Sequence, residues 1–357
     1  MVGIGIVGCG SIVRMRHAPE CSKNPNVVIK GFYNRSTGRA EEMVQNYGGR
    51  VYTSLDELMK DPEVEAIIVA TPNNSHMEIS IMALESGKHV LCEKPCVVNM
   101  KELKKLEAAV ACSEKVFMAA QNQRFLEVHI KAKELYKKGE IGKGLSFWTE
   151  FSHSGPEGWS VEGENTWFLE KERSVLGVLG DLGIHKIDLM RWLLETNVKM
   201  VGADLKNLHK KQRREKALGM SDYAVCQLEM KNGIEGTVIS SWCNYGKCRN
   251  QTVIYGTEGV MVIDPEAERE QILVYKKDER KVWTCHCQGN SQVVDAFVKA
   301  IVEGSGSASP VGIFEVAEDM KVIFAAEEAD RFKRWIALEE TINDKSKNSS
   351  TCGKTEI

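Results

Sequence analysis

Two short stretches of this 357-residue chain carry side chains whose types and spacing suit acid–base chemistry. In VLCEKPCVVN, an apolar run ends in Glu93, Lys94 and Pro95. Because proline cannot continue a central strand, the carboxylate and the amine leave the strand together at its end. In GDLGIHKID, Asp181 and His185 are four residues apart, which places them on one helix face, one turn from each other. Together these residues could supply a cation, a base and an orienting carboxylate.

A third stretch, GIGIVGCGSIVRMRH, reads as a strand, a glycine turn and a helix. Gly8 allows a tight turn, and Gly10 lets a pyrophosphate approach the unpaired N–H groups of the helix N-terminus. The position usually held by a third small residue is Val13, which predicts looser packing of the helix on the strand. The stretch favours a dinucleotide site over a simple strand-to-helix turn.

The end of the next strand, GFYNRST, bears on the choice between NAD and NADP. An NAD enzyme tends to offer Asp or Glu to the ribose there. This chain has Asn34, Arg35 and Ser36 instead, which favours NADP slightly, with Arg35 and Ser36 holding the 2′-phosphate. The same residues also suit NAD, with Arg35 on the adenine face and Asn34 bonding a ribose hydroxyl.

The first part of the chain has the alternating pattern that positions such motifs at the edge of a parallel sheet. Strands are predicted at 3–8, 27–33, 65–71, 89–94 and 115–120, and helices at 39–48, 54–61, 75–87 and 99–113. Strands alternating with helices indicate right-handed β-α-β units, and near-continuous Val and Ile indicate burial on both sheet faces.

After about Phe125 the pattern changes. A helix is predicted at 128–139, a strand at 145–151 and a helical block at 178–194; strand-rich runs follow at 221–242, 250–264, 271–277 and 281–287. Turn signals KNG and TEG within these runs predict an antiparallel meander. A long helical stretch over 293–340, broken near Pro310, ends the fold, and the polar tail 341–357 is expected to be disordered.

Composition excludes several classes of function. A net charge of -3 gives no reason to expect nucleic acid, and the basic cluster at 209–214 reads as a solvated loop. We expect no signal peptide and no membrane span. The 11 scattered cysteines indicate reduced thiols and a cytoplasmic protein. Cys285, His286 and Cys287 read as a strand and not as metal ligands, so no metal site is expected.

Four stretches together resemble the Gfo/Idh/MocA oxidoreductases, which include glucose–fructose oxidoreductase and inositol dehydrogenase. They are GIGIVGCGSI, VATPNNSH, GKHVLCEKP and GDLGIHKIDLMRWL, and the resemblance extends from Met1 to about Leu338. It implies an α/β protein with an N-terminal Rossmann domain at 1–123, a doubly wound parallel sheet. A C-terminal α+β domain at 124–340, with a large and mainly antiparallel sheet, would bind substrate and mediate oligomerisation.

The resemblance implies an NAD(P)-dependent enzyme that transfers hydride between the nicotinamide and a hydroxyl-bearing carbon of a sugar, sugar derivative or cyclitol. Lys94 would donate to the reacting hydroxyl and to the nicotinamide ribose, and would lower the pKa of the alcohol; a cis bond before Pro95 is expected. Glu93 would orient the ribose and Lys94. His185 would take the hydroxyl proton, and Asp181 would accept hydrogen bonds from the same or a neighbouring hydroxyl.

The motifs and the resemblance together predict one set of cofactor-binding residues and one set of substrate-binding residues. The cofactor set is Gly8, Gly10, Ser11, Ile12, Asn34, Arg35, Ser36, Thr71, Pro72, Asn73, His76, Glu93, Lys94 and Gln121. The substrate set is Lys94, Arg124, Trp159, Trp167, Asp181, His185 and Tyr245. Of these residues, His76 is expected to act as a structural cap or packing residue and not as a catalyst. Arg124 could equally form an ion pair with an acidic side chain. Trp242 is assigned to the sheet core or a subunit interface.

One departure from the family pattern precedes the His185 helix. Relatives often have three glycines there, whereas this chain keeps Gly177 and has Val175 and Leu176 before it. The pocket rim is therefore expected to differ, and the substrate could differ from the usual polyols.

Two other functions use the same fold. Some relatives are glycosidases that oxidise a glycoside transiently, eliminate the aglycone, add water and reduce again on retained NAD(+). A non-enzymatic sugar or cofactor sensor is disfavoured because Lys94 and His185 are both present. The open face of the second sheet is expected to bury against another copy, which predicts a homodimer or homotetramer. The sugar, the oxidised carbon and the physiological direction are not determined by these motifs.

Overall fold

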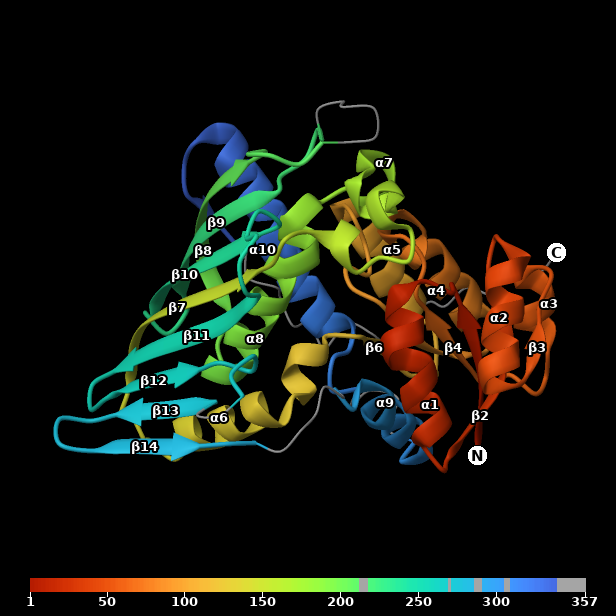
Figure 1. Ribbon diagram of the computed structural model, residues 1–357, viewed down its shortest axis with the longest axis horizontal. Coiled ribbons are helices and arrows are strands. Elements are labelled where there is room, and N and C mark those ends of the chain that lie inside the picture. The colour runs from red at the N-terminus through yellow and green to blue at the C-terminus, as the bar shows by residue number, and fades with distance from the viewer. Residues whose placement is uncertain (212–217, 269–270, 286–290, 305–308, 339–357) are drawn as a thin grey trace.

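The computed structural model describes residues 1–211, 218–268, 271–285, 291–304 and 309–338. Two sheets with helices between and around them make up the molecule (Figure 1). No helix in the described ranges is long and apolar enough to cross a bilayer. The predicted tail at 341–357, residues 212–214 of the basic cluster, and His286 and Cys287 lie outside the described residues.

The first sheet has six parallel strands in the order β3-β2-β1-β4-β5-β6. The order reverses between β1 and β4, so their carboxyl ends form the crevice where ligands of doubly wound sheets bind. Every residue of β1 and β4 is buried, as expected for strands covered on both faces. The strands are β1 (Val2–Val7), β2 (Val27–Tyr33), β3 (Arg50–Val51), β4 (Ala66–Val69), β5 (His89–Cys92) and β6 (Phe117–Ala119).

Helices fill the connections of this sheet, and the alternation predicted from the sequence is confirmed. A π-helical turn, η1 (Val13–His17), follows the glycine loop, and the buried Val13 begins it. The helices are α1 (Ala18–Lys23), α2 (Thr37–Tyr47), α3 (Leu55–Lys60), α4 (His76–Glu85) and α5 (Met100–Ala111), with 3-10 turns η2 (Asn73–Ser75) and η3 (Asn122–Phe125).

The second sheet has nine strands in the order β14-β13-β12-β11-β7-β10-β9-β8-β15. Both predicted hairpins form, at β9–β10 and β11–β12, and β7 with β10 is the only parallel pair among the described strands of this second sheet. The strands are β7 (Gly144–Ser152), β8 (Val198–Lys206), β9 (Tyr223–Met230), β10 (Glu235–Ser241), β11 (Arg249–Gly256), β12 (Val260–Ile263), β13 (Ile272–Tyr275), β14 (Arg280–Trp283) and β15 (Ile336–Ala337).

Helices cover one face of this sheet and join it to the first. Helix α10 packs on β8 and also on α5, so one helix contacts both halves. The predicted long helical stretch is divided into α9 and α10, on either side of Pro310. The helices are α6 (Glu127–Lys137), α7 (Lys171–Ser174), α8 (Ile184–Leu194), α9 (Val293–Val302) and α10 (Ile313–Phe332), with the short turns η4 (Pro156–Gly158), η5 (Gly163–Asn165), η6 (Trp167–Leu169) and η7 (Leu179–Gly183).

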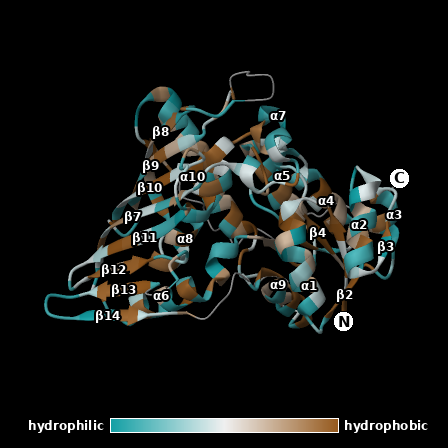
Figure 2. Cartoon of the chain, in the orientation of Figure 1, coloured by the Kyte–Doolittle hydropathy of each residue, from teal (hydrophilic) through white to brown (hydrophobic). Residues whose placement is uncertain are grey.

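Hydrophobic residues follow the strands of both sheets, while hydrophilic residues occupy turns such as that between β13 and β14 (Figure 2). In Figure 1 the second sheet has its helices on the side that faces the first sheet, and no labelled helix lies on its other side. One row of side chains that are not fully buried crosses that outer side at Trp148, Val253, Val262, Leu273 and Val282, which are register neighbours on five strands.

Candidate active site

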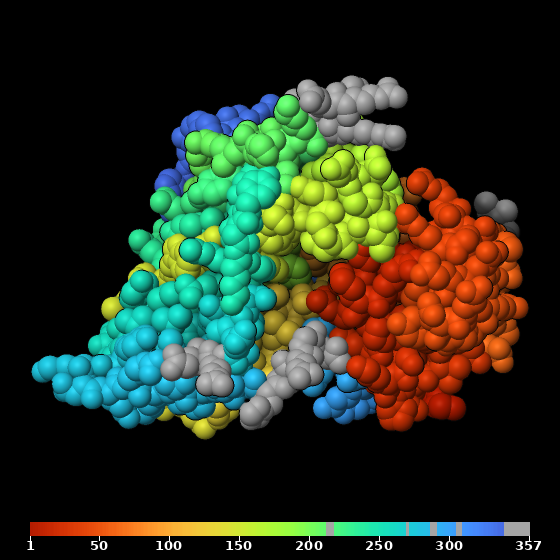
Figure 3. All heavy atoms as spheres, in the orientation of Figure 1, coloured from red at the N-terminus to blue at the C-terminus, as the bar shows by residue number. Residues whose placement is uncertain are grey.

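A cavity of about 1200 Å³ lies between the two halves of the molecule. The space-filling view shows the surface hollowed between the red N-terminal half and the green and cyan second half (Figure 3). This volume is at the upper end of ligand pockets, roughly 300–1,000 Å³, so it can hold an extended ligand or two molecules. The predicted residues that line it are Gly8, Gly10, Ser11, Ile12, Asn34, Arg35, Ser36, Thr71, Pro72, Asn73, His76, Glu93, Lys94, Trp159, Trp167, Asp181 and His185.

The glycine loop fits a dinucleotide. Gly8 has φ +99°, and a Cβ there would come within 2.4 Å of the Ala70 carbonyl oxygen, so no other residue fits this turn. At Gly10 an added Cβ would meet no atom within 4 Å, because the loop faces the open cavity. A phosphate could therefore approach the backbone here, as the sequence predicts.

The end of β2 is organised by Asn34. Its Oδ1 accepts a hydrogen bond from the Cys9 N–H at 3.1 Å, and its Nδ2 donates to the Ser36 carbonyl at 2.9 Å. Arg35 is exposed at the same end of the cavity. Asn34 thus ties the glycine loop to the end of β2, a role that sequence reasoning missed.

A loop from the second half closes over this end. The Val161 N–H donates to Ser11 Oγ at 2.8 Å, and the Arg39 guanidinium lies 3.0 Å from Glu162 Oε1. Glu162 Oε2 also accepts from the Trp167 N–H at 3.2 Å. Neither Arg39 nor Glu162 is among the predicted residues, because no local sequence pattern links residues 123 positions apart.

The segment Glu93–Lys94–Pro95 leaves the carboxyl end of β5, and the Lys94–Pro95 bond is cis, as expected. Glu93 is buried, and its Oε1 lies 2.8 Å from His17 Nε2. Burial by itself would raise the pKa of Glu93, but the hydrogen bond and charge of His17, with the charge of Lys94, lower it to about 2. Glu93 is therefore a carboxylate at neutral pH.

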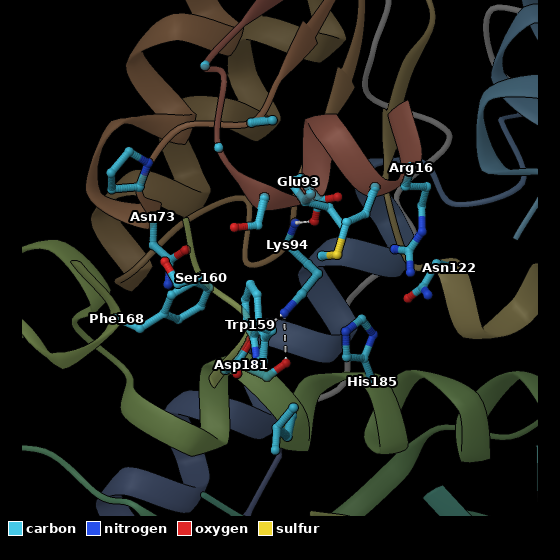
Figure 4. A pocket seen from close by; sticks show the side chains of 18 of the residues that line it. Arg16, Asn73, Glu93, Lys94, Asn122, Trp159, Ser160, Phe168, Asp181 and His185 are labelled. Atoms are coloured by element: carbon cyan, nitrogen blue, oxygen red, sulfur yellow. Dashed lines mark hydrogen bonds and ion pairs between the residues drawn. The ribbon is translucent and has the colours of Figure 1, made fainter. Parts of the chain in front are cut away.

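Lys94 extends from the first sheet to the helix of the second half. Its Nζ donates to Asp181 Oδ1 at 2.7 Å and to the Asp181 carbonyl at 2.8 Å (Figure 4). The other carboxylate oxygen of Asp181 accepts from Trp242 Nε1 at 3.0 Å. Trp242 is fully buried, so its assignment to the core is right but incomplete: its indole also orients Asp181.

His185 lies one helical turn beyond Asp181 and lines the same cavity. Burial, helped by the charges of Lys94 and Arg16, lowers the pKa of His185 well below 6.5. The imidazole is therefore neutral at pH 7 and able to accept a proton. Its Nδ1 is buried without a hydrogen-bond partner among the described residues.

His76 has the structural role expected for it. Its Nδ1 lies 2.8 Å from the Pro95 carbonyl oxygen and its Nε2 lies 2.7 Å from the Thr71 carbonyl oxygen. It ties the turn after β4 to the turn after β5. Asn73, in the neighbouring turn, donates from Nδ2 to the Ser174 carbonyl of the second half at 2.9 Å.

Aromatic side chains form one wall of the cavity. Trp167 stacks on Phe168 with ring centroids 3.9 Å apart, and Trp159 meets Phe168 edge to face at 5.1 Å. All three line the cavity, so they can present apolar ring faces to a ligand.

Three predicted residues do not line the cavity. Arg124 is buried and binds Asp188 through Nε at 2.8 Å and Glu315 through a terminal nitrogen at 2.9 Å, so it acts in packing and not at the substrate. Gln121 is buried and donates to Asp319 at 3.4 Å.

Tyr245 is 61% exposed, and its ring packs edge to face against the ring of His209 instead of facing the cavity. The family resemblance suggested Gln121, and residue type suggested Arg124 and Tyr245, but none of the three lines the cavity.

The pocket rim upstream of α8, where relatives often have three glycines, contains a strained residue in this chain. Val175 adopts φ 65° and ψ -60°, and the Leu176 N–H donates to the Ser174 carbonyl at 2.8 Å. This is a γ-turn of the positive-φ type, which is rare for any residue and costly for a β-branched one. Gly177 has φ 56° and lies against Ser221, where a Cβ would meet the carbonyl oxygen at 2.4 Å.

Comparison with known proteins agrees with this geometry. Residues 2–121 match a model described as "Oxidoreductase family, NAD-binding Rossmann fold", and residues 129–262 match the GFO/IDH/MocA C-terminal domain. Glucose-6-phosphate 3-dehydrogenase of Bacillus subtilis is 33% identical over 248 residues, covering 68% of this chain and 69% of that protein. Levoglucosan dehydrogenase of Pseudarthrobacter phenanthrenivorans is 29% identical over 315 residues, covering 76% and 80%.

Solved structures share the fold. A levoglucosan dehydrogenase in complex with NADH and levoglucosan has a TM-score of 0.83 with 24% identity, covering 95% of this chain and 99% of that one. The matched regions include the glycine loop, Lys94, Asp181 and His185. The chain therefore belongs to the Gfo/Idh/MocA family of oxidoreductases, whose N-terminal half is an NAD-binding Rossmann fold.

Proposed function

We propose that the protein oxidises a hydroxyl-bearing carbon of a sugar or sugar derivative, with Lys94, Asp181 and His185 as the reacting group of side chains. The observation that carries the proposal is the Lys94–Asp181 pair, at 2.7 Å, with the neutral His185 one turn away in the same cavity. Relatives named for glucose 6-phosphate, levoglucosan and myo-inositol support a carbohydrate or cyclitol substrate.

Lys94, Asp181 and His185 each have a separate role in the proposed reaction. An ammonium has three donors; Asp181 takes two of those of Lys94, and the third is free for the substrate oxygen. A cation at that oxygen stabilises the alkoxide character that develops as the proton leaves. His185 receives the proton, because its imidazole is neutral. A bound nicotinamide cofactor would supply the acceptor for the hydride that leaves the same carbon.

The two halves have separate tasks in this proposal. The Rossmann domain, 1–123, binds the dinucleotide along Gly8, Gly10 and the carboxyl ends of β1, β4 and β5. The second domain, 124–340, contributes Asp181, His185 and the aromatic wall. Both are needed because Lys94 and its partner come from different domains.

The choice between NAD and NADP depends on the residues at the end of the cavity that would hold the adenosine ribose. The absence of an acid after β2 favours NADP slightly. However, the Glu162 carboxylate already pairs with Arg39, the cation in the first turn of α2 that could otherwise bind a 2′-phosphate. Because a carboxylate repels a phosphate, we place NAD(H) ahead of NADP(H). Titration of the protein with both cofactors tests this: Glu162→Gln should improve NADP(+) binding about tenfold relative to NAD(+), whereas no change would remove Glu162 from the account.

A homo-oligomer is part of the proposal. The outward row on the second sheet is apolar at Trp148, Val253, Val262 and Leu273, and such a surface favours association with another copy. Light scattering should give a dimer or tetramer mass for the wild type and a smaller mass for Val253→Glu. A monomeric wild type would contradict this part.

The reaction itself is tested with the purified protein. After denaturation, mass spectrometry identifies any retained cofactor; the native protein is then incubated with NAD(+) and a panel of sugars, sugar acids and cyclitols. Formation of NADH with one of these supports the proposal. Retained NAD(H) together with hydrolysis of a glycoside and no build-up of NADH would instead assign the glycosidase chemistry. Binding without any turnover would indicate a sensor.

A further inference from the structure

Arg16 is a charged residue close to Lys94 and His185, and the proposed mechanism gives it no role. It belongs to η1, directly after the glycine loop, and lines the same cavity as Lys94 and His185. Figure 4 shows its guanidinium pointing into the cavity beside Asn122 and above His185. The influence of its charge on the pKa of His185 is consistent with this proximity.

Two charged neighbours of Arg16 already have partners: Lys94 pairs with Asp181 at 2.7 Å, and the Glu93 carboxylate lies 2.8 Å from His17 Nε2. Within the part of the chain that the structure describes, Arg16 has no ion pair and no hydrogen bond. A guanidinium has five donors in a planar fork suited to carboxylate or phosphate, so a free one beside a reaction centre is a strong anion receptor.

The neighbouring Asn122 is also buried, and its Oδ1 has no hydrogen-bond partner among the described residues. Two carboxylates, Glu127 and Glu266, line the same cavity, but neither forms an ion pair with Arg16. Asn122 can therefore bond a sugar hydroxyl while Arg16 holds a charged group of the same molecule.

We propose that the substrate is an anionic sugar, whose carboxylate or phosphate is bound by Arg16 while a ring hydroxyl lies at Lys94 and His185. This inference rests on the proposed dehydrogenase function and narrows its substrate class. Carboxylate and phosphate share the chemistry that Arg16 recognises, so the experiment distinguishes them. Charge-assisted hydrogen bonds contribute about 1.5–3 kcal/mol each, equivalent to roughly 10- to 150-fold in affinity.

The test uses D-glucose, D-glucuronate and D-glucose 6-phosphate, which share one ring and differ at carbon 6. Calorimetric titration of the NADH-loaded wild type should show at least about tenfold tighter binding of one anion than of glucose. Arg16→Gln should remove that difference, and Arg16→Lys should retain part of it. Affinity for the anion should also fall with rising salt.

The control is the affinity for NADH, which should stay within about threefold in Arg16→Gln. A large loss of NADH affinity in Arg16→Gln would show that Arg16 binds the cofactor and would overturn the inference. Equal affinity of the wild type for glucose and both anions would also overturn it. Tighter binding of D-glucosamine than of either anion would overturn it too. Binding is measured without turnover, so the anion site at Arg16 can be tested separately from catalysis. If the anion binds through Arg16 but no sugar is oxidised, the anion site is confirmed and only the dehydrogenase proposal is contradicted.

Discussion

The Lys94 ammonium lies 2.7 Å from Asp181 Oδ1, although Lys94 follows a strand of the parallel sheet and Asp181 precedes a helix packed on the other sheet. The contact joins residues 87 positions apart. The reacting group is therefore assembled only when both halves are in place, and any change that turns the Asp181 carboxylate should misplace Lys94.

Trp242→Phe tests this dependence. The variant keeps an aromatic ring in the core but removes the 3.0 Å hydrogen bond from the indole to Asp181. A hydrogen bond to a charged group is worth about 1.5–3 kcal/mol, so kcat/KM should fall roughly tenfold to a hundredfold. Trp192→Phe is the matched control, because Trp192 does not line the cavity and its ring faces Lys133 instead. Similar kcat/KM values for both variants would show that Trp242 acts only in packing.

The activity should depend on pH through His185. Its pKa is lowered well below 6.5 by burial and by nearby cations, so the base is already deprotonated at pH 7. As the pH falls, activity should stay level through pH 6.5 and decline only at more acidic values, when the imidazole gains a proton. The pH profile of kcat/KM measures this. An inflection at or above pH 6.5 that disappears in His185→Asn would contradict the low pKa.

Arg124→Met should affect stability and not substrate binding. Arg124 and Asp188 are both buried, and removal of the guanidinium leaves an uncompensated carboxylate in the core. Breaking a buried pair costs about 3–5 kcal/mol of the free energy of unfolding, measured by urea denaturation. The double variant Arg124→Met/Asp188→Leu should recover much of that loss. A raised KM with unchanged stability would return Arg124 to the substrate site.

Much of this architecture follows from local sequence signals. Periodicity and glycine turns predict both hairpins and the strands of the parallel sheet except the two-residue β3, and the Asp181–His185 spacing predicts two side chains on one helix face. Contacts between distant segments leave no such signal. Arg39 with Glu162, Trp242 with Asp181, and the free Arg16 become visible only in three dimensions, because each depends on how the two halves pack.

Val175→Gly should stabilise the protein. Val175 has φ 65° in a γ-turn, and strain of this kind costs about 1–3 kcal/mol. Glycine removes the strain but adds about 0.5–1 kcal/mol of unfolded-state entropy, so a net gain of roughly 1 kcal/mol is expected. Gly177→Val is the opposite control and should destabilise, because its Cβ would meet the Ser221 backbone. A loss of stability in Val175→Gly would mean that the turn is not strained.

The most direct test of the account is NADH formation by wild type and Lys94→Ala with the sugar that the panel identifies. Lys94 acts on the reacting oxygen and not on the cofactor phosphates, so turnover should fall by about 10²–10⁴, with NADH affinity retained. That result would place Lys94 at the chemical step. Equal turnover in the two proteins would contradict the assignment of the Lys94–Asp181 pair as the reaction centre.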